Sequence, residues 1–119
     1  MSLNVHVYST DETGEPTYHE PEEPWMDMAG FEVCRTRLYG CALASARGLT
    51  LLPGLAHGYL DLSAEEVPNL LAEADIILAD SEAFGEASGF GAYYVERRVG
   101  NIRSACLRAL SLGANVVIW

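Results

Sequence analysis

Lysine is absent from this chain of 119 residues, and all seven of its basic residues are arginine. Against 17 acidic residues, these arginines leave a formal net charge of −10. A negative field of this size repels nucleic-acid phosphate and anionic lipid. We therefore expect no direct nucleic-acid partner and no membrane partner, and the charge favours a basic protein instead.

Paired cysteine motifs and long apolar runs are also missing. Cys34, Cys41 and Cys106 are odd in number, and their spacings match neither a redox C-x-x-C motif nor a zinc site. No apolar run approaches the roughly 18 residues of a membrane span, and no signal-peptide pattern opens the sequence. These absences predict a cytoplasmic protein with no metal site and no cofactor, whose thiols pack as small hydrophobic groups.

Catalytic signatures are the third absence. There is no G-x-S-x-G elbow, and without lysine there is no P-loop. His57 precedes Asp61 by four residues and could form a pair for acid–base chemistry. A partly buried structural histidine is the more ordinary interpretation. The sequence thus favours a non-enzymatic protein without deciding the question.

Half of the residues are apolar, and their spacing predicts one α+β or small α/β domain over residues 1–119. We expect two layers, a short mixed sheet of three or four strands packed with about three helices. The predicted strands are residues 3–8, 58–62 and 115–119, and the predicted helices are residues 31–47 (with a break at Gly40), 63–79 and 92–112.

Two turn signals refine these boundaries. Ser63 and Glu66 have the spacing of a capping box, which predicts a helix start distorted by Pro68. Residues 80–91 predict a glycine-rich loop before the last helix. Its glycines could cradle an anion at that helix's N-terminus, although a flexible connection is the simpler interpretation.

Residues 10–27 combine acidic residues with prolines, which predicts an exposed acidic loop. A hard cation could use such oxygen atoms, but the ligand pattern of a calcium loop is missing. Aromatic side chains flanking the charges resemble the anchors of protein interfaces. The candidate partner-binding residues are Tyr18, Glu20, Glu22, Glu23 and Trp25.

A second candidate site lies near the 81–93 loop. Aromatic residues surround this loop, and Arg97 lies one helical turn after Tyr93. They could line a small-ligand pocket, whereas simple packing of the loop is the default interpretation. The candidate ligand-binding residues are His57, Tyr93, Tyr94 and Arg97.

Five segments follow a pattern found in small bacterial and phage-borne proteins. They are residues 1–8, an apolar helix at 70–78, an acidic-aromatic loop at 80–93, the pair Ala105-Cys106, and a short strand at 114–118. The chain therefore resembles these uncharacterised α+β proteins over roughly half its length, with residues 31–62 outside the match. The resemblance implies a fold and no activity.

Taken together, the residues favour an acidic, non-enzymatic protein-interaction module. Its partner would be a basic protein. The module would cover a functional surface of that partner, as inhibitor and immunity proteins do. The alternative is a small-ligand-binding protein or enzyme with a pocket near the 81–93 loop. Formation of a homodimer is an independent hypothesis.

Overall fold

A computed structural model describes residues 2–119 of the protein. The strands are β1 (Ser2–Thr10), β2 (Pro16–His19), β3 (Met28–Phe31), β4 (Leu60–Leu62) and β5 (Asn115–Ile118). The α-helices are α1 (Ala42–Ala46), α2 (Val67–Ala79), α3 (Ser81–Ser88) and α4 (Ala92–Leu112). Short 3-10 or π turns form η1 (Pro24–Asp27), η2 (Arg35–Tyr39) and η3 (Leu52–Ala56).

The five strands form one sheet with the order β2-β1-β5-β4, and β3 also pairs with β1. β1 pairs with β2 along its second half and with β3 along its first, while β5 lies on its other edge. Each of these pairings is antiparallel, as is that of β4 with β5. The α+β fold is confirmed, although the predicted mixed sheet is antiparallel and has one more strand than the largest number expected.

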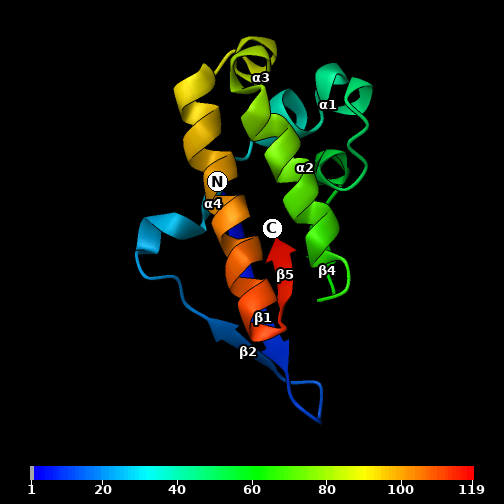
Figure 1. The fold of residues 1–119 in the computed structure, drawn as a ribbon, viewed down its shortest axis with the longest axis vertical. Coiled ribbons are helices and arrows are strands. Elements are labelled where there is room, and N and C mark those ends of the chain that lie inside the picture. The colour runs from blue at the N-terminus through cyan, green and yellow to red at the C-terminus, as the bar shows by residue number, and fades with distance from the viewer. Residues whose placement is uncertain (1) are drawn as a thin grey trace.

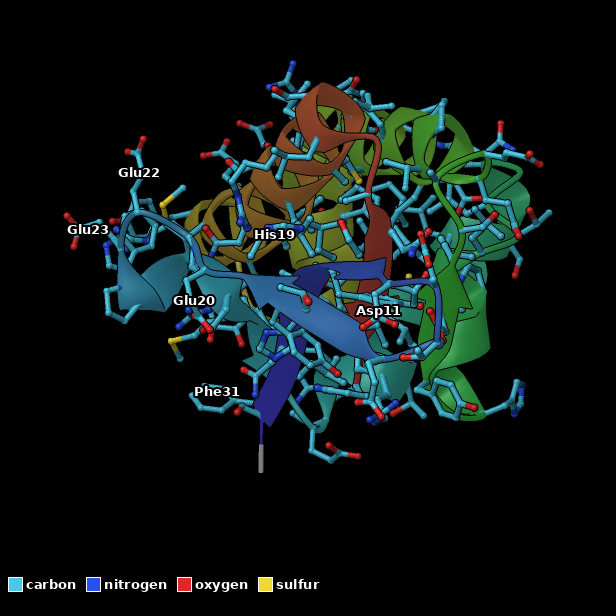
Figure 2. The ribbon with its side chains drawn as sticks, turned by 90° about the horizontal axis from the view of Figure 1, so that it is seen from below. Asp11, His19, Glu20, Glu22, Glu23 and Phe31 are labelled. Carbon is cyan, nitrogen blue, oxygen red and sulfur yellow. The ribbon has the colours of Figure 1, made fainter. Side chains whose placement is uncertain are left out.

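The helix α4 packs on one face of this sheet, whereas α1 and α3 lie beyond the end of the strands (Figure 1). Leu3, Val5 and Val7 alternate along β1 and are buried, as the period-2 pattern predicts. The long helix α4 crosses this face and packs against α2, and Figure 1 shows both in front of the strands. The view of Figure 2, from below, shows α4 in orange over one side of β1 and β2. The core therefore lies between the sheet and this helix pair.

The predicted loop over residues 10–27 contains more order than the sequence suggests. Residues 16–19 form β2, which pairs with the second half of β1 in a hairpin. Pro16 is tolerated because it is the first residue of a strand at the edge of the sheet. In the connection, the carboxylate of Asp11 accepts bonds from the amides of Thr13 and Glu15. Only residues 20–23 separate β2 from the η1 turn.

The helix predicted over residues 31–47 is wrong for its first part. Residues 28–31 instead form β3, and the rest divides into η2 and α1. The division falls at Gly40, where the predicted break is confirmed. A Cβ atom there would lie 2.8 Å from the carbonyl oxygen of Arg35 and 2.9 Å from the Cβ of Ala56. Close packing against η3 therefore selects glycine at this position.

The glycine-rich loop predicted over residues 80–91 is also wrong, because residues 81–88 form the helix α3. Gly85 lies within it, and a Cβ atom there would approach the backbone nitrogen of Ala92 to 2.4 Å. Gly89 and Gly91 end α3 and begin α4 with positive φ angles. These glycines allow a tight connection between two packed helices. Their spacing is therefore explained by packing and does not require a bound anion.

The remaining elements agree with the sequence. The helix over residues 92–112, the Gly113 cap and the strands of residues 60–62 and 115–118 are all confirmed. The capping box is not, because the Glu66 amide donates to the main-chain carbonyl of Ser63 and no side chain caps α2. Within residues 2–119, none of the helices is long and apolar enough to cross a membrane.

Candidate binding face

The side of the sheet that faces away from α4 carries aromatic and polar side chains. We call it the open face, and it comprises His6, Tyr8, Tyr18, Asp61, Val117 and Trp119. These residues come from four adjacent strands or their ends, and the register places Asp61 opposite Val117, Val117 opposite His6, and Tyr8 opposite Tyr18. Two of the rings remain half exposed, Tyr18 at 41% and Trp119 at 47%.

Four rings on the open face form one cluster. Tyr18 lies within 6.0 Å of Tyr8 and 5.9 Å of His6, measured between ring centroids. Trp119 lies 5.9 Å from His6 and 6.3 Å from Tyr18. Beneath them Val117 is only 3% exposed, so the rings shield the sheet where no helix does. Aromatic pairs at such distances attract one another beyond simple burial.

The Tyr18–Trp119 pair separates two open recesses. The Asp61 recess has a volume of about 310 Å³ and is lined by Tyr8, Thr10, Gly14, Pro16, Tyr18, Asp61, Val117 and Trp119. The Glu20 recess has a volume of about 280 Å³ and is lined by His6, Tyr18, Glu20 and Trp119. Each contains a carboxylate beside aromatic walls, and neither is lined by an arginine.

The Asp61 carboxylate is held in place by Tyr8, whose hydroxyl donates a hydrogen bond to Oδ1. Partial burial, followed by this bond and the negative charge of Asp61, raises the pKa of Tyr8 to about 12. Tyr8 therefore remains a neutral donor at physiological pH. One carboxylate oxygen is oriented by this contact, and Asp61 keeps further acceptor capacity for a ligand.

The arginines are used within the fold. Their contacts are Arg35 with Glu32, Arg37 with the Ser88 carbonyl, Arg47 with Asp80, Arg97 with Tyr93, Arg98 over the ring of Tyr94, Arg103 with Asp75, and Arg108 with the His19 carbonyl. Burial lowers the pKa of Arg108, and the nearby carboxylates of Glu20 and Glu22 oppose this effect. Arg108 thus partly offsets the charge of Glu20.

A third recess lies on the other side of the molecule, between η1 and α4. It has a volume of about 370 Å³ and is lined by Trp25, Met26, Tyr93, Glu96, Arg97, Gly100, Asn101 and Ser104. We call it the α4 recess. The Asn101 amide donates to the carbonyls of Trp25 and Met28, which fixes η1 against α4. The guanidinium of Arg97 lies 5.1 Å from the Trp25 ring.

The predicted partner-binding residues therefore do not lie together in one site. Tyr18 and Glu20 line the Glu20 recess, whereas Trp25 faces α4. Figure 2 shows Glu22 and Glu23 projecting outward from the segment that leads into η1. Among the described residues, no three histidine, cysteine or acidic side chains are placed to hold a metal ion.

The predicted ligand-binding residues do not all meet either. Tyr93, Tyr94 and Arg97 line a shallow recess of about 220 Å³ together with Arg98. His57 is not among its lining residues and is exposed at the end of η3. Asp61, its expected partner, instead accepts the bond from Tyr8. The Tyr94 hydroxyl lies 3.5 Å from the Cys34 sulfur and accepts a bond from the Phe31 amide, so this hydroxyl is engaged within the fold.

Sequence reasoning missed Tyr8 and Trp119. A signal for both was present, because an aromatic residue on the polar side of an alternating strand indicates a face that is not simply solvated. His6 and Tyr8 alternate with buried valines in β1, and Trp119 lies two positions after Val117. What the sequence could not supply is the strand order that brings them together.

Comparisons with known proteins add no relative. No protein-family model, no curated protein and no solved structure matches the chain. The resemblance to bacterial and phage-borne proteins therefore stays a prediction, and the functional argument depends on the geometry of the open face.

Proposed function

We propose that the protein is a non-enzymatic interaction module whose open face binds a basic segment of a partner protein. The observation that carries this proposal is the pair of recesses on the open face, each with a carboxylate and aromatic walls and neither lined by an arginine. Such a module would mask its partner's basic surface, in the manner of an inhibitor or immunity protein.

The chemistry of the open face matches cationic side chains. An arginine or lysine over the face of a tryptophan or tyrosine is attracted by the ring quadrupole. The carboxylates of Asp61 and Glu20 lie beside these rings and could pair with the same cation. The net charge of −10 would steer a basic partner toward the protein from a distance.

Magnitudes indicate how large such an interface must be. A cation over an exposed ring contributes about 0.5–1 kcal/mol, and an exposed ion pair contributes at most about 1 kcal/mol. Micromolar affinity requires about 8 kcal/mol. Several basic residues must therefore bind together, and the affinity must weaken as salt screens them.

Isothermal titration calorimetry with a defined arginine-rich peptide tests the proposal. We expect Trp119→Ala and Tyr18→Ala each to weaken binding about tenfold or more, because each removes a ring that lines both recesses. The control is Glu82→Gln combined with Glu86→Gln, on the exposed side of α3 at the opposite end of the molecule from the β1–β2 hairpin (Figure 1). Equal weakening by the control would show unspecific attraction and contradict the proposal.

A second candidate function is small-ligand binding in the α4 recess. It is favoured by one observation, that Trp25, Tyr93 and Arg97 meet there around about 370 Å³. This volume is within the range of ligand sites, near its lower end. Binding of small molecules that is abolished by Tyr93→Ala and unchanged by Tyr18→Ala would support this function over the first.

A further inference from the structure

We infer that the open face recognises two arginine side chains of one extended segment, one in the Asp61 recess and one in the Glu20 recess, with the Tyr18–Trp119 pair between them. The inference rests on the proposed function and specifies the sequence that the partner must present. It follows from the arrangement of the two recesses and not from the overall charge.

The two recesses share one wall. Tyr18 and Trp119 line both, with ring centroids 6.3 Å apart. On one side of this wall lies Asp61, and on the other lies Glu20. A single cation cannot occupy both recesses, because the rings lie between them. Two cations can do so, and each would then contact a ring and a carboxylate.

Arginine suits these recesses better than lysine. A guanidinium is planar, so it can stack on a ring while its edge donates to a carboxylate. In the Asp61 recess, the Tyr8 hydroxyl already orients the acceptor. The ammonium group of lysine is a compact, strongly hydrated charge that cannot stack in this way.

The spacing of the two arginines follows from strand geometry. In an extended segment, residues i and i+2 project from the same side and are separated by about 7 Å. Asp61 on β4 and Glu20 after β2 lie three strand spacings apart, about 14 Å, so two such steps, from i to i+4, match their separation. Adjacent residues project to opposite sides, so an Arg-Arg pair would fill only one recess. The expected motif is therefore Arg-x-x-x-Arg.

The two carboxylates should contribute unequally to the affinity for the peptide. Asp61 is held by a hydrogen bond from Tyr8, whereas the charge of Glu20 acts on Arg108. We expect Asp61→Asn to cost more affinity than Glu20→Gln, and both substitutions preserve side-chain shape.

Peptides of ten residues with a serine–glycine background provide the test. The arginines are placed at i,i+1, at i,i+2 or at i,i+4, and one peptide carries a single arginine. By NMR titration, the i,i+4 peptide should bind about fivefold more tightly than any other member of the series. Replacing both of its arginines by lysine should remove most of this gain.

A double-mutant cycle assigns each arginine. Substituting one arginine of the i,i+4 peptide by neutral citrulline should make the protein insensitive to Asp61→Asn, and substituting the other should make it insensitive to Glu20→Gln. The Glu82→Gln protein should respond to both substitutions as the unmodified protein does.

Equal binding of all spacings on the open face would overturn this inference while leaving the proposed function standing. Binding that ignores Tyr18→Ala and Trp119→Ala would overturn both. Preferential binding of an oligosaccharide or single-stranded RNA to the same rings would also overturn both, since these ligands need stacking without a pair of cations.

Discussion

At the scale of single residues, the acid that matters most for the fold is the buried Glu73 on α2. Its carboxylate accepts bonds from the amides of Thr50, Leu51 and Leu52 and from the Thr50 hydroxyl. These amides begin η3, so Glu73 joins η3 to α2. It uses its charge inside the molecule, in contrast to Asp61 and Glu20 on the open face.

Glu73→Ala should lower the free energy of unfolding by about 3 kcal/mol, because three amides lose a charged acceptor. Glu73→Gln should cost less, since one acceptor oxygen remains. Urea denaturation measures both, with the exposed Glu86→Ala as the control at no more than about 0.5 kcal/mol. A cost for Glu73→Ala no larger than that of the control would contradict the role assigned to Glu73.

The three cysteines should differ in reactivity. Burial, with a smaller effect of Asp75, raises the pKa of Cys106 to about 12, so its reactive thiolate is scarce at pH 8. Cys34 is buried, and Cys41 is partly exposed. Mass spectrometry after iodoacetamide treatment at pH 8 should find Cys41 modified first, and all three thiols modified after denaturation. Rapid alkylation of Cys106 in the folded protein would contradict this assignment.

At the scale of elements, two helical glycines form a natural comparison. A methyl group at Gly85 would meet the backbone of Gly91 and Ala92, whereas one at Gly100 would meet no atom within 4 Å. Gly85→Ala should therefore destabilise the protein by about 2 kcal/mol, and Gly100→Ala should stabilise it by up to about 1 kcal/mol. Thermal denaturation of the two variants measures the contrast, and equal effects would contradict the close packing of α3 on α4.

The elements also show what the sequence could and could not predict. The helix α4 could be predicted because apolar residues recur at helical spacing along its 21 residues and Gly113 marks its end. The helix at residues 81–88 could not be predicted, because Gly85, the glycines that follow at 89 and 91, and several small residues favour a loop locally. This helix depends on contact with α4. β3 was missed for a similar reason, since Phe31 and Cys34 fit a helical spacing as well as a strand end.

For the candidate site, the sequence supplied Tyr18 and Glu20 but not their surroundings. Tyr8 and Trp119 lie 111 residues apart and become neighbours of Tyr18 only through the order β2-β1-β5. Trp25 seemed equivalent to Tyr18 in the sequence. Two hydrogen bonds from Asn101 to the backbone around η1 place it on the other side of the protein.

At the scale of the whole molecule, the net charge of −10 should oppose the compact state through self-repulsion. The ion pairs of Arg35, Arg47 and Arg103 involve partly exposed side chains and contribute little. Raising sodium chloride from 20 to 200 mM should therefore increase the melting temperature by about 2–5 °C. A decrease would show that attractive pairs outweigh the repulsion.

The open face itself is tested most directly by the two tryptophans, since Trp119 lies on it and Trp25 lies in the α4 recess. The measurement is the fluorescence of two variants, Trp25→Phe and Trp119→Phe, titrated with the Arg-x-x-x-Arg peptide, which contains no aromatic residue. We predict a saturable change in emission for Trp25→Phe, which retains Trp119, and none for Trp119→Phe. A saturable change confined to Trp119→Phe would place the peptide in the α4 recess and contradict the account.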